Sequence, residues 1–231
     1  GRLPFNIGLD NAAHRAWCAE RWGIPQERLD KTAGMQNTGM AVGMMERALK
    51  GEVKAMFMIY ATHIDLPDAY NLSRPALTKM FTVVQDIYKD APNNLYADVI
   101  LPAATWGEWV GGLYVQSERR LYVADGTANP IKGTRPDMDM VIDKGKLIGK
   151  LLGLDVDKIF PYQRKANGYY DPEEVFRDFC LASKGTDADL SGILEVEKET
   201  GKSPYQQIRE LRGIQWPAPT AAIAKAGGTK R

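Results

Sequence analysis

Asp86 is the side chain whose place in the sequence points most directly to chemistry. It follows the apolar run Phe81 to Val84 and the amide Gln85. A short β-rich run that ends in an acid is typical of a buried parallel strand whose carboxyl end opens to a ligand crevice. An ionised carboxylate accepts two donors, which suits the N1 and exocyclic amine of a guanine base. A simpler interpretation, in which Asp86 caps a turn after the strand, stays open.

The elements that must position Asp86 are two strands and the helix between them. The run Val53–Tyr60 predicts a strand, and a helix is expected to end near Lys79. Strand, helix and strand within about thirty residues indicate a βαβ unit, whose crossover is right-handed in nearly all cases. A further apolar run, Val99 to Leu101, stops at Pro102 and is interpreted as a second buried strand.

The carboxyl edge of this unit is expected to carry further polar groups. Gln85, Asp86 and Ile87 come from the second strand, and Thr62 and His63 follow the first. The Thr62 hydroxyl and the His63 ring can each donate or accept a hydrogen bond. His63 is equally well explained as a loop histidine bonded to the backbone.

Composition limits the class of protein. The chain has 231 residues with 44% apolar content, and 30 basic against 29 acidic residues give a net charge of +1. Without a basic block, nucleic acid is not an expected partner. No apolar run approaches the roughly 18 residues that a membrane helix needs. The chain begins at Gly1 without an initiator Met or a signal pattern, so both ends are interpreted as cut.

The cysteines and histidines do not indicate a metal site. Cys18 and Cys180 are too far apart for a CxxC arrangement, and His14 and His63 do not join them at ligand spacing. Two separate buried thiols are favoured, with a disulfide as the alternative. The sequence also contains no Gly-x-Ser-x-Gly elbow and no phosphate-cradling GxxxxGK motif.

Helices are predicted on the amino-terminal side of the βαβ unit. Apolar spacing predicts one from Asn11 to Trp22, with His14 and Arg15 on its outer side. The polar segment 24–39 is expected to be a loop, and a second helix then closes at Gly51.

The carboxyl-terminal part is expected to mix helices with irregular chain. A helix is predicted from Met138 to Leu152, with an apolar set available for burial. Segment 158–170 is interpreted as irregular. Asp171 with Pro172 opens another helix, and a last short helix is expected to start at Ser203 or Pro204.

Several separated motifs, in this order, resemble one family. They are VVQDIY, ADVILPAATWGE, SERR, TRPDMDMVIDKGKLIGKLLG, SPYQQIRELRGIQWPAP and GGTKR. The chain is similar over nearly its whole length to catalytic subunits of the dimethyl sulfoxide reductase family of molybdopterin oxidoreductases, which includes formate dehydrogenases, nitrate reductases and arsenite oxidases. Such enzymes are several times longer, so the chain resembles an internal piece.

The resemblance implies an α/β fold. Residues 1–122 would be the later half of a mostly parallel, doubly wound domain that binds molybdopterin guanine dinucleotide. Residues 123–231 would be a helical and irregular segment that leads to a C-terminal barrel. The texture of segment 111–123 is closest to the arsenite oxidase branch, which includes iodate-reductase-like proteins.

The resemblance also implies cofactors, partners and a location. The cofactor would be bis(molybdopterin guanine dinucleotide) with molybdenum or tungsten, with an iron–sulfur cluster in the missing N-terminal part. A small iron–sulfur subunit would be the electron-transfer partner, and the location periplasmic, with cytoplasmic as the alternative. The reaction would be a two-electron oxygen-atom transfer on a small oxyanion such as arsenite. Iodate reductases, nitrate reductases, formate dehydrogenase-like enzymes and a non-catalytic structural paralogue are the alternatives.

Particular residues match positions that bind the cofactor in the family. Asp86 matches the acid that reads one guanine, and Asp90 stands where many members have Thr. The loop 61–63 falls where Gly-Thr-Asn-Pro is usual. Gln116 and Ser117 lie on the stretch before Glu-Arg-Arg that runs near the pterin, and Gln for Asn keeps the amide chemistry there.

Overall fold

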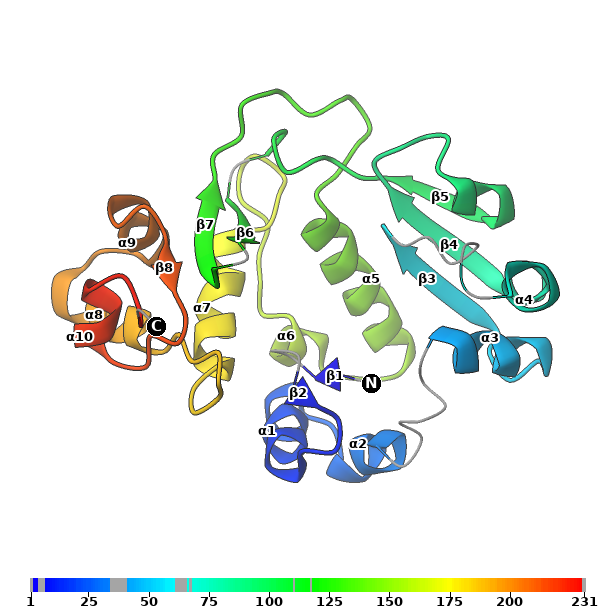
Figure 1. The fold of residues 1–231 in the computed structure, drawn as a ribbon, viewed down its shortest axis with the longest axis horizontal. Coiled ribbons are helices and arrows are strands. Elements are labelled where there is room, and N and C mark those ends of the chain that lie inside the picture. The colour runs from blue at the N-terminus through cyan, green and yellow to red at the C-terminus, as the bar shows by residue number, and fades with distance from the viewer. Residues whose placement is uncertain are drawn as a thin grey trace. The chain divides into compact units, whose positions relative to one another are not determined.

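The structure is a computed structural model of the chain (Figure 1). The residues that it describes are 2–3, 7–33, 41–60, 66, 68–109, 111–116 and 118–229. They form two compact units, the first from residues 1–105 and 131–144 and the second from residues 106–130 and 145–231. Each unit therefore takes two stretches of chain. The expected boundary after Tyr122 concerns the domains of a longer protein and stays a prediction.

A parallel sheet of three strands is the centre of the first unit. Its strands are β3 (Ala55–Ile59), β4 (Phe81–Asp86) and β5 (Val99–Pro102), in the order β3-β4-β5. Ile59 pairs with Gln85, and Asp86 pairs with Pro102. The parallel pairing of β3 and β4 confirms the predicted βαβ unit and brings the carboxyl ends of all three strands to one edge.

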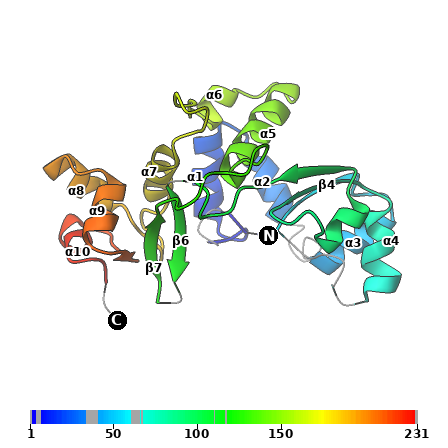
Figure 2. The same ribbon diagram turned by 90° about the horizontal axis from the view of Figure 1, so that it is seen from above.

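Helices cover one face of this sheet. They are α3 (Ala41–Leu49), the π-helical turn η4 (Ala69–Ser73) and α4 (Arg74–Leu77). Met45 and Leu77 from these helices pack with Met58 and Val84 from the strands in one apolar core. Figure 2 shows α3 and α4 on the same side of β4. Burial of this apolar surface, rather than local propensity, stabilises the short helices.

The opposite face meets the first half of α5 (Asp137–Leu151). The Lys144 ammonium lies 4.6 Å from the centre of the Phe57 ring on β3. Helices on both faces of a parallel sheet define a mixed α/β fold of the doubly wound kind, as expected.

Two details of the sheet differ from expectation. β4 runs two residues beyond Val84, so that Gln85 and Asp86 belong to the strand itself. β5 was expected to be buried, but Val99 is 38% and Ile100 46% exposed. The reason is position, because β5 pairs only with β4 and is an edge strand among the described residues.

The amino-terminal segment contains a short hairpin and two helices. The elements are β1 (Arg2–Leu3), β2 (Ile7–Gly8), α1 (Ala12–Trp22) and α2 (Gln26–Ala33). The side chain of Asn11 caps α1 by accepting the His14 N–H, and Gly23 ends the helix in the left-handed region. The bounds predicted for α1 are confirmed.

Two predictions for this segment are wrong. Residues 26–33 form α2 instead of a loop. The segment has no sustained helical spacing of apolar residues, but Leu29 packs against a small apolar cluster, and this tertiary packing stabilises the helix. His14, placed on the outer side of α1, is 8% exposed and stacks on Trp17 with ring centres 5.7 Å apart. Histidine is intermediate between the buried and the exposed residue types, so its polar ring did not by itself predict an exposed position.

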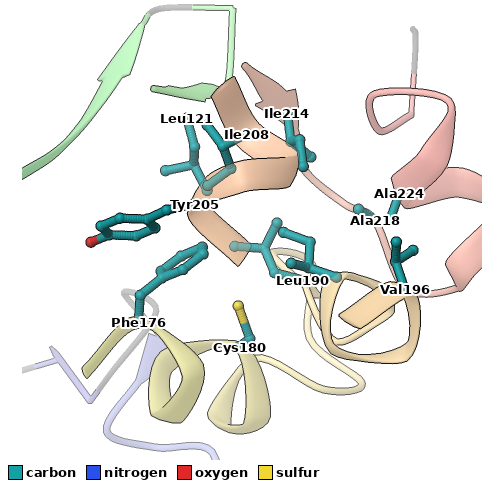
Figure 3. Packing of buried hydrophobic residues seen from close by; sticks show 11 residues of the cluster. Leu121, Phe176, Cys180, Leu190, Val196, Tyr205, Ile208, Ile214, Ala218 and Ala224 are labelled. Atoms are coloured by element: carbon teal, nitrogen blue, oxygen red, sulfur yellow. The ribbon is translucent and has the colours of Figure 1, made fainter. Parts of the chain in front are cut away.

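The second unit combines a small antiparallel sheet with helices. The strands are β6 (Gly112–Gln116), β7 (Arg120–Ala124) and β8 (Ile214–Gln215), in that order. The helices are α6 (Val156–Ile159), α7 (Pro172–Ala182), α8 (Gly192–Thr200), α9 (Pro204–Glu210) and α10 (Ala221–Lys225). Figure 3 shows Phe176 and Cys180 of α7 directed toward the helix that carries Tyr205 and Ile208.

Capping was predicted better than burial in this unit. Asp171 caps α7, as expected. The expected last helix, α9, starts at Pro204, and Ser203 forms a capping box with Gln206 that was not predicted. Helices α8 and α10 were not predicted, and α6 enters the segment expected to be irregular. Neither described cysteine forms a disulfide and both are buried, which confirms two separate thiols.

The apolar residues that α5 buries lie in its first half, where Met140 is 5% and Ile142 4% exposed. Leu147 is 62% and Leu151 79% exposed. The second half of the helix packs through glycines instead, because a Cβ at Gly145 would lie 2.5 Å from the Phe160 ring and one at Gly149 would lie 2.6 Å from Val156. None of the helices in the described ranges is long and apolar enough to cross a bilayer.

Candidate functional site

A pocket of about 450 Å³ lies at the carboxyl edge of the parallel sheet. Tyr60, the residue after β3, lines it together with Asp86 at the end of β4 and residues 88–93 of the loop that follows. This loop leads into the 3₁₀ turn η5 (Pro92–Tyr96). In open α/β sheets, ligands bind outside the carboxyl ends of the strands, so the pocket is where such a site is expected.

The carboxylate of Asp86 both closes a turn and faces the pocket. Asp86 is only 8% exposed, and its Oδ1 accepts the Tyr88 N–H at 2.9 Å. Its main-chain oxygen accepts the Ala103 N–H at 3.0 Å, so β5 holds the backbone in place. Among the described residues, no hydrogen bond reaches Oδ2. The turn interpretation is therefore correct for Oδ1, and the same residue lines the pocket.

The loop after β4 is held in shape by Asn94. Its Nδ2 donates to the main-chain oxygens of Tyr88 at 3.2 Å and Lys89 at 2.7 Å. These bonds fix the backbone that carries Asp90, which lines the pocket, and its role as a cofactor contact stays a prediction. Sequence reasoning missed Asn94, although Asn side chains commonly bond nearby main-chain groups in turns.

Gln85 is a correction to the expected ligand edge. It is 1% exposed, and its side chain lies on the other face of the sheet, donating to the Asp137 carboxylate. Its Oε1 accepts the Lys144 ammonium at 2.6 Å. The alternation of side chains along a strand explains the difference, since neighbours such as Gln85 and Asp86 point to opposite faces.

This network has an electrostatic consequence for Lys144. Burial lowers the pKa of the Lys144 ammonium below its ordinary value, and the nearby Asp137 carboxylate opposes this by favouring the charged form. Neither residue was singled out in the sequence, because the contact joins positions 52 and 59 residues from Gln85.

The other residues predicted to contact the cofactor do not line this pocket or lie outside the described residues. Ile87 is half-buried and is not among the residues that line the pocket. Gln116 ends β6 in the second unit, where its backbone pairs with Arg120. Thr62, His63 and Ser117 lie outside the described residues, so their roles stay predictions.

The second unit has a pocket of its own, of about 680 Å³. Its charged lining is occupied by internal contacts. Asp171 caps α7 and lies 3.1 Å from Lys165, the Glu173 carboxylate accepts the Tyr205 N–H at 2.7 Å, and Arg209 pairs with Asp125. Within the described ranges, no three His, Cys, Asp or Glu side chains are arranged to hold a metal ion.

One protein family matches the part of the chain that contains the parallel sheet. A model of the molybdopterin oxidoreductase family matches residues 19–143, which is more than half of the chain and includes the whole parallel sheet. The chain therefore belongs to the molybdopterin oxidoreductase family.

Several curated relatives are nitrate reductases. The chain is 29% identical to the assimilatory nitrate reductase catalytic subunit of Bacillus subtilis over 94% of its own length and 27% of that protein. It is 28% identical to the assimilatory nitrate reductase of Haloferax mediterranei and 25% identical to the periplasmic nitrate reductase of Desulfovibrio desulfuricans, covering 95% and 94% of the chain and 26% of each relative. The chain thus spans about a quarter of these relatives. Likeness to arsenite oxidases gains no support from them.

Proposed function

We propose that the chain is part of the catalytic subunit of a molybdenum oxidoreductase, and that its pocket holds the guanine end of a molybdopterin guanine dinucleotide. The observation that carries this proposal is the position of Asp86. A carboxylate lies in a pocket at the carboxyl edge of a parallel sheet, inside the segment that the family model matches.

The residues present fit a guanine base. Its N1–H and exocyclic amine are two adjacent donors, and a carboxylate offers about four lone-pair sites, of which the Tyr88 N–H takes one. Adenine presents an acceptor at N1 and would place it against the negative charge. The pocket of about 450 Å³ lies within the range of small-molecule sites. Charge-assisted bonds in this setting favour guanine over adenine.

The chain's own residues bind and orient. When bound, the molybdenum cofactor supplies two-electron redox chemistry that no side chain offers. Asp86 would hold the nucleotide end, with Asp90 beside it, while Thr62, His63, Gln116 and Ser117 are further proposed contacts. The bis form of the cofactor, tungsten in place of molybdenum, an iron–sulfur cluster, a small iron–sulfur partner subunit and the cellular location are proposals about the longer protein.

Nitrate is the substrate that the relatives favour. Three of them are described as nitrate reductases, two assimilatory and one periplasmic. Reduction of nitrate to nitrite takes up two electrons and two protons and releases one water molecule, which matches a two-electron centre. We therefore place nitrate ahead of arsenite, iodate and formate as the substrate of the longer protein.

The test uses the full-length subunit, purified with its cofactor. We expect molybdenum, and guanine nucleotide released on denaturation, in a fixed ratio to protein, and nitrite produced from nitrate with a reduced viologen dye. Arsenite and formate with an oxidised dye, and iodate with the reduced dye, serve as comparisons. Absence of both molybdenum and guanine would contradict the proposal and favour a non-catalytic paralogue. Turnover of arsenite but not of nitrate would contradict the proposed substrate and leave the rest of the proposal standing.

A further inference from the structure

Tyr60 is an exposed aromatic residue held in an unusual backbone conformation. It is 66% exposed and has a φ of 44°. Residues other than glycine rarely adopt positive φ, and a bulky side chain there strains the backbone. Such a conformation persists where the surrounding structure imposes it, and the Tyr60 N–H donates to the main-chain oxygen of Gln85 at 3.0 Å.

The strand pairing puts Tyr60 next to Asp86. Ile59 pairs with Gln85, so the following residues of the two strands, Tyr60 and Asp86, are level at the carboxyl edge of the sheet. Both line the same pocket. Tyr60 thus brings a large planar ring to the pocket that Asp86 lines, and the residue is more than half exposed.

We infer that Tyr60 is a base-binding residue, whose ring stacks on the guanine that Asp86 recognises. This inference rests on the proposed function. The two side chains divide the task, because Asp86 reads the edge of the base and the ring of Tyr60 covers a face. Stacking on an aromatic ring contributes to binding whichever base is present, whereas the carboxylate selects for guanine.

The experiment measures GMP binding to the cofactor-free full-length subunit, by equilibrium dialysis and by the proton spectrum of the nucleotide. Tyr60→Leu removes the ring, and Tyr60→Phe keeps it. We expect Tyr60→Leu to weaken GMP binding about tenfold, in line with alanine substitutions of stacking residues, and Tyr60→Phe to remain within about twofold of wild type. The H8 signal of GMP should move upfield on binding to wild type and Tyr60→Phe, and move less with Tyr60→Leu.

Tyr70→Leu is the matched control, because Tyr70 is also an exposed tyrosine, 77% exposed, and does not line the pocket. It should bind GMP as wild type does. Equal affinity and equal H8 shifts for Tyr60→Leu and wild type would overturn the inference.

Asp86→Asn separates the inference from the proposed function. If Asp86→Asn weakens GMP binding and Tyr60→Leu does not, the inference fails and the function stands. If Tyr60→Leu reduces affinity and the H8 shift while Asp86→Asn changes nothing, the ring binds the base and the proposed role of Asp86 is wrong. Failure of wild type to bind GMP would contradict both.

Discussion

Lys144 and Gln85 join helix α5 to the strand that carries Asp86. The Lys144 ammonium donates to the Gln85 side-chain oxygen at 2.6 Å, and the Gln85 amide nitrogen donates in turn to Asp137. Gln85 is the residue immediately before Asp86, and it is almost fully buried. A satisfied polar network of this kind stiffens its surroundings, and here it fixes the end of β4.

Gln85→Leu should destabilise the protein. The apolar side chain leaves the Asp137 and Lys144 groups without their shared partner, and an unsatisfied partly buried group costs about 1–3 kcal/mol. Urea unfolding measures the loss. Gln26→Leu, at an exposed glutamine of α2, is the control and should change stability by less than about 0.5 kcal/mol. Equal stability of the two variants would show that the network contributes nothing.

Gly228 should tolerate no side chain. Its φ is 93°, and a Cβ there would lie 1.8 Å from the main-chain oxygen of Gln215. Gly201 also has positive φ, 72°, but open space around it. Gly201→Ala should cost about 1 kcal/mol for the backbone conformation alone. Gly228→Ala should cost about 1–3 kcal/mol more, because the backbone must shift to relieve the overlap. Thermal unfolding measures the stability of the two variants. Similar losses of stability in both would contradict the close contact between position 228 and the Gln215 oxygen.

Cys18 gives the protein a pH dependence at alkaline pH. Burial raises the pKa of its thiol from 9.0 to about 11. The folded state therefore keeps a proton that the unfolded state releases, so this contribution to stability is complete below pH 9 and is lost as the pH rises to about 11. Cys18→Ala lacks it. The difference in unfolding free energy between wild type and Cys18→Ala should shrink over that interval, and a constant difference would contradict the raised pKa.

Arg177 and Glu197 link helices α7 and α8 through a two-pronged ion pair. Arg177 Nη2 lies 2.7 Å and Nε 3.0 Å from Glu197 Oε1. Both side chains are partly exposed, which limits the coupling energy to about 1 kcal/mol. A double-mutant cycle with Arg177→Met and Glu197→Gln measures it. Arg177→Lys should recover less than half of the coupling energy, because an ammonium group cannot form the bidentate hydrogen bonds that the guanidinium forms with the carboxylate. Strictly additive single and double variants would show that the pair is not coupled.

Local signals in the sequence were sufficient for many element ends. Asn11, Asp171 and Ser203 are capping side chains that act on main-chain groups two or three residues away. The β-rich run that ends in Asp86 needs only its own neighbours to be recognised as a strand. Such features are predictable because their physical cause lies within one turn or one strand.

Features that depend on distant chain were missed. Helix α2 is stabilised by packing of Leu29, and Gln85 is buried by residues more than fifty positions away. The exposure of Leu151 follows from α5 packing through its glycines. Of the residues that line the pocket, Asp86 and Asp90 were named as candidate site residues from the sequence, and Tyr60 was not. The backbone conformation of Tyr60 and its position opposite Asp86 depend on how β3 and β4 pair in the folded sheet.

The central claim is that Asp86 holds the guanine of the cofactor, and the rate of cofactor loss from Asp86→Asn tests it most directly. Asparagine keeps an oxygen for the Tyr88 N–H and so preserves the turn, but it places a donor against the guanine N1–H. Loss of a charge-assisted contact is worth about 1.5–3 kcal/mol, which predicts release of guanine nucleotide roughly 10- to 150-fold faster than from wild type. Asp157→Asn, at an exposed acid of α6, should release it at the wild-type rate. Release of the nucleotide from Asp86→Asn at the wild-type rate and with wild-type occupancy would contradict the account.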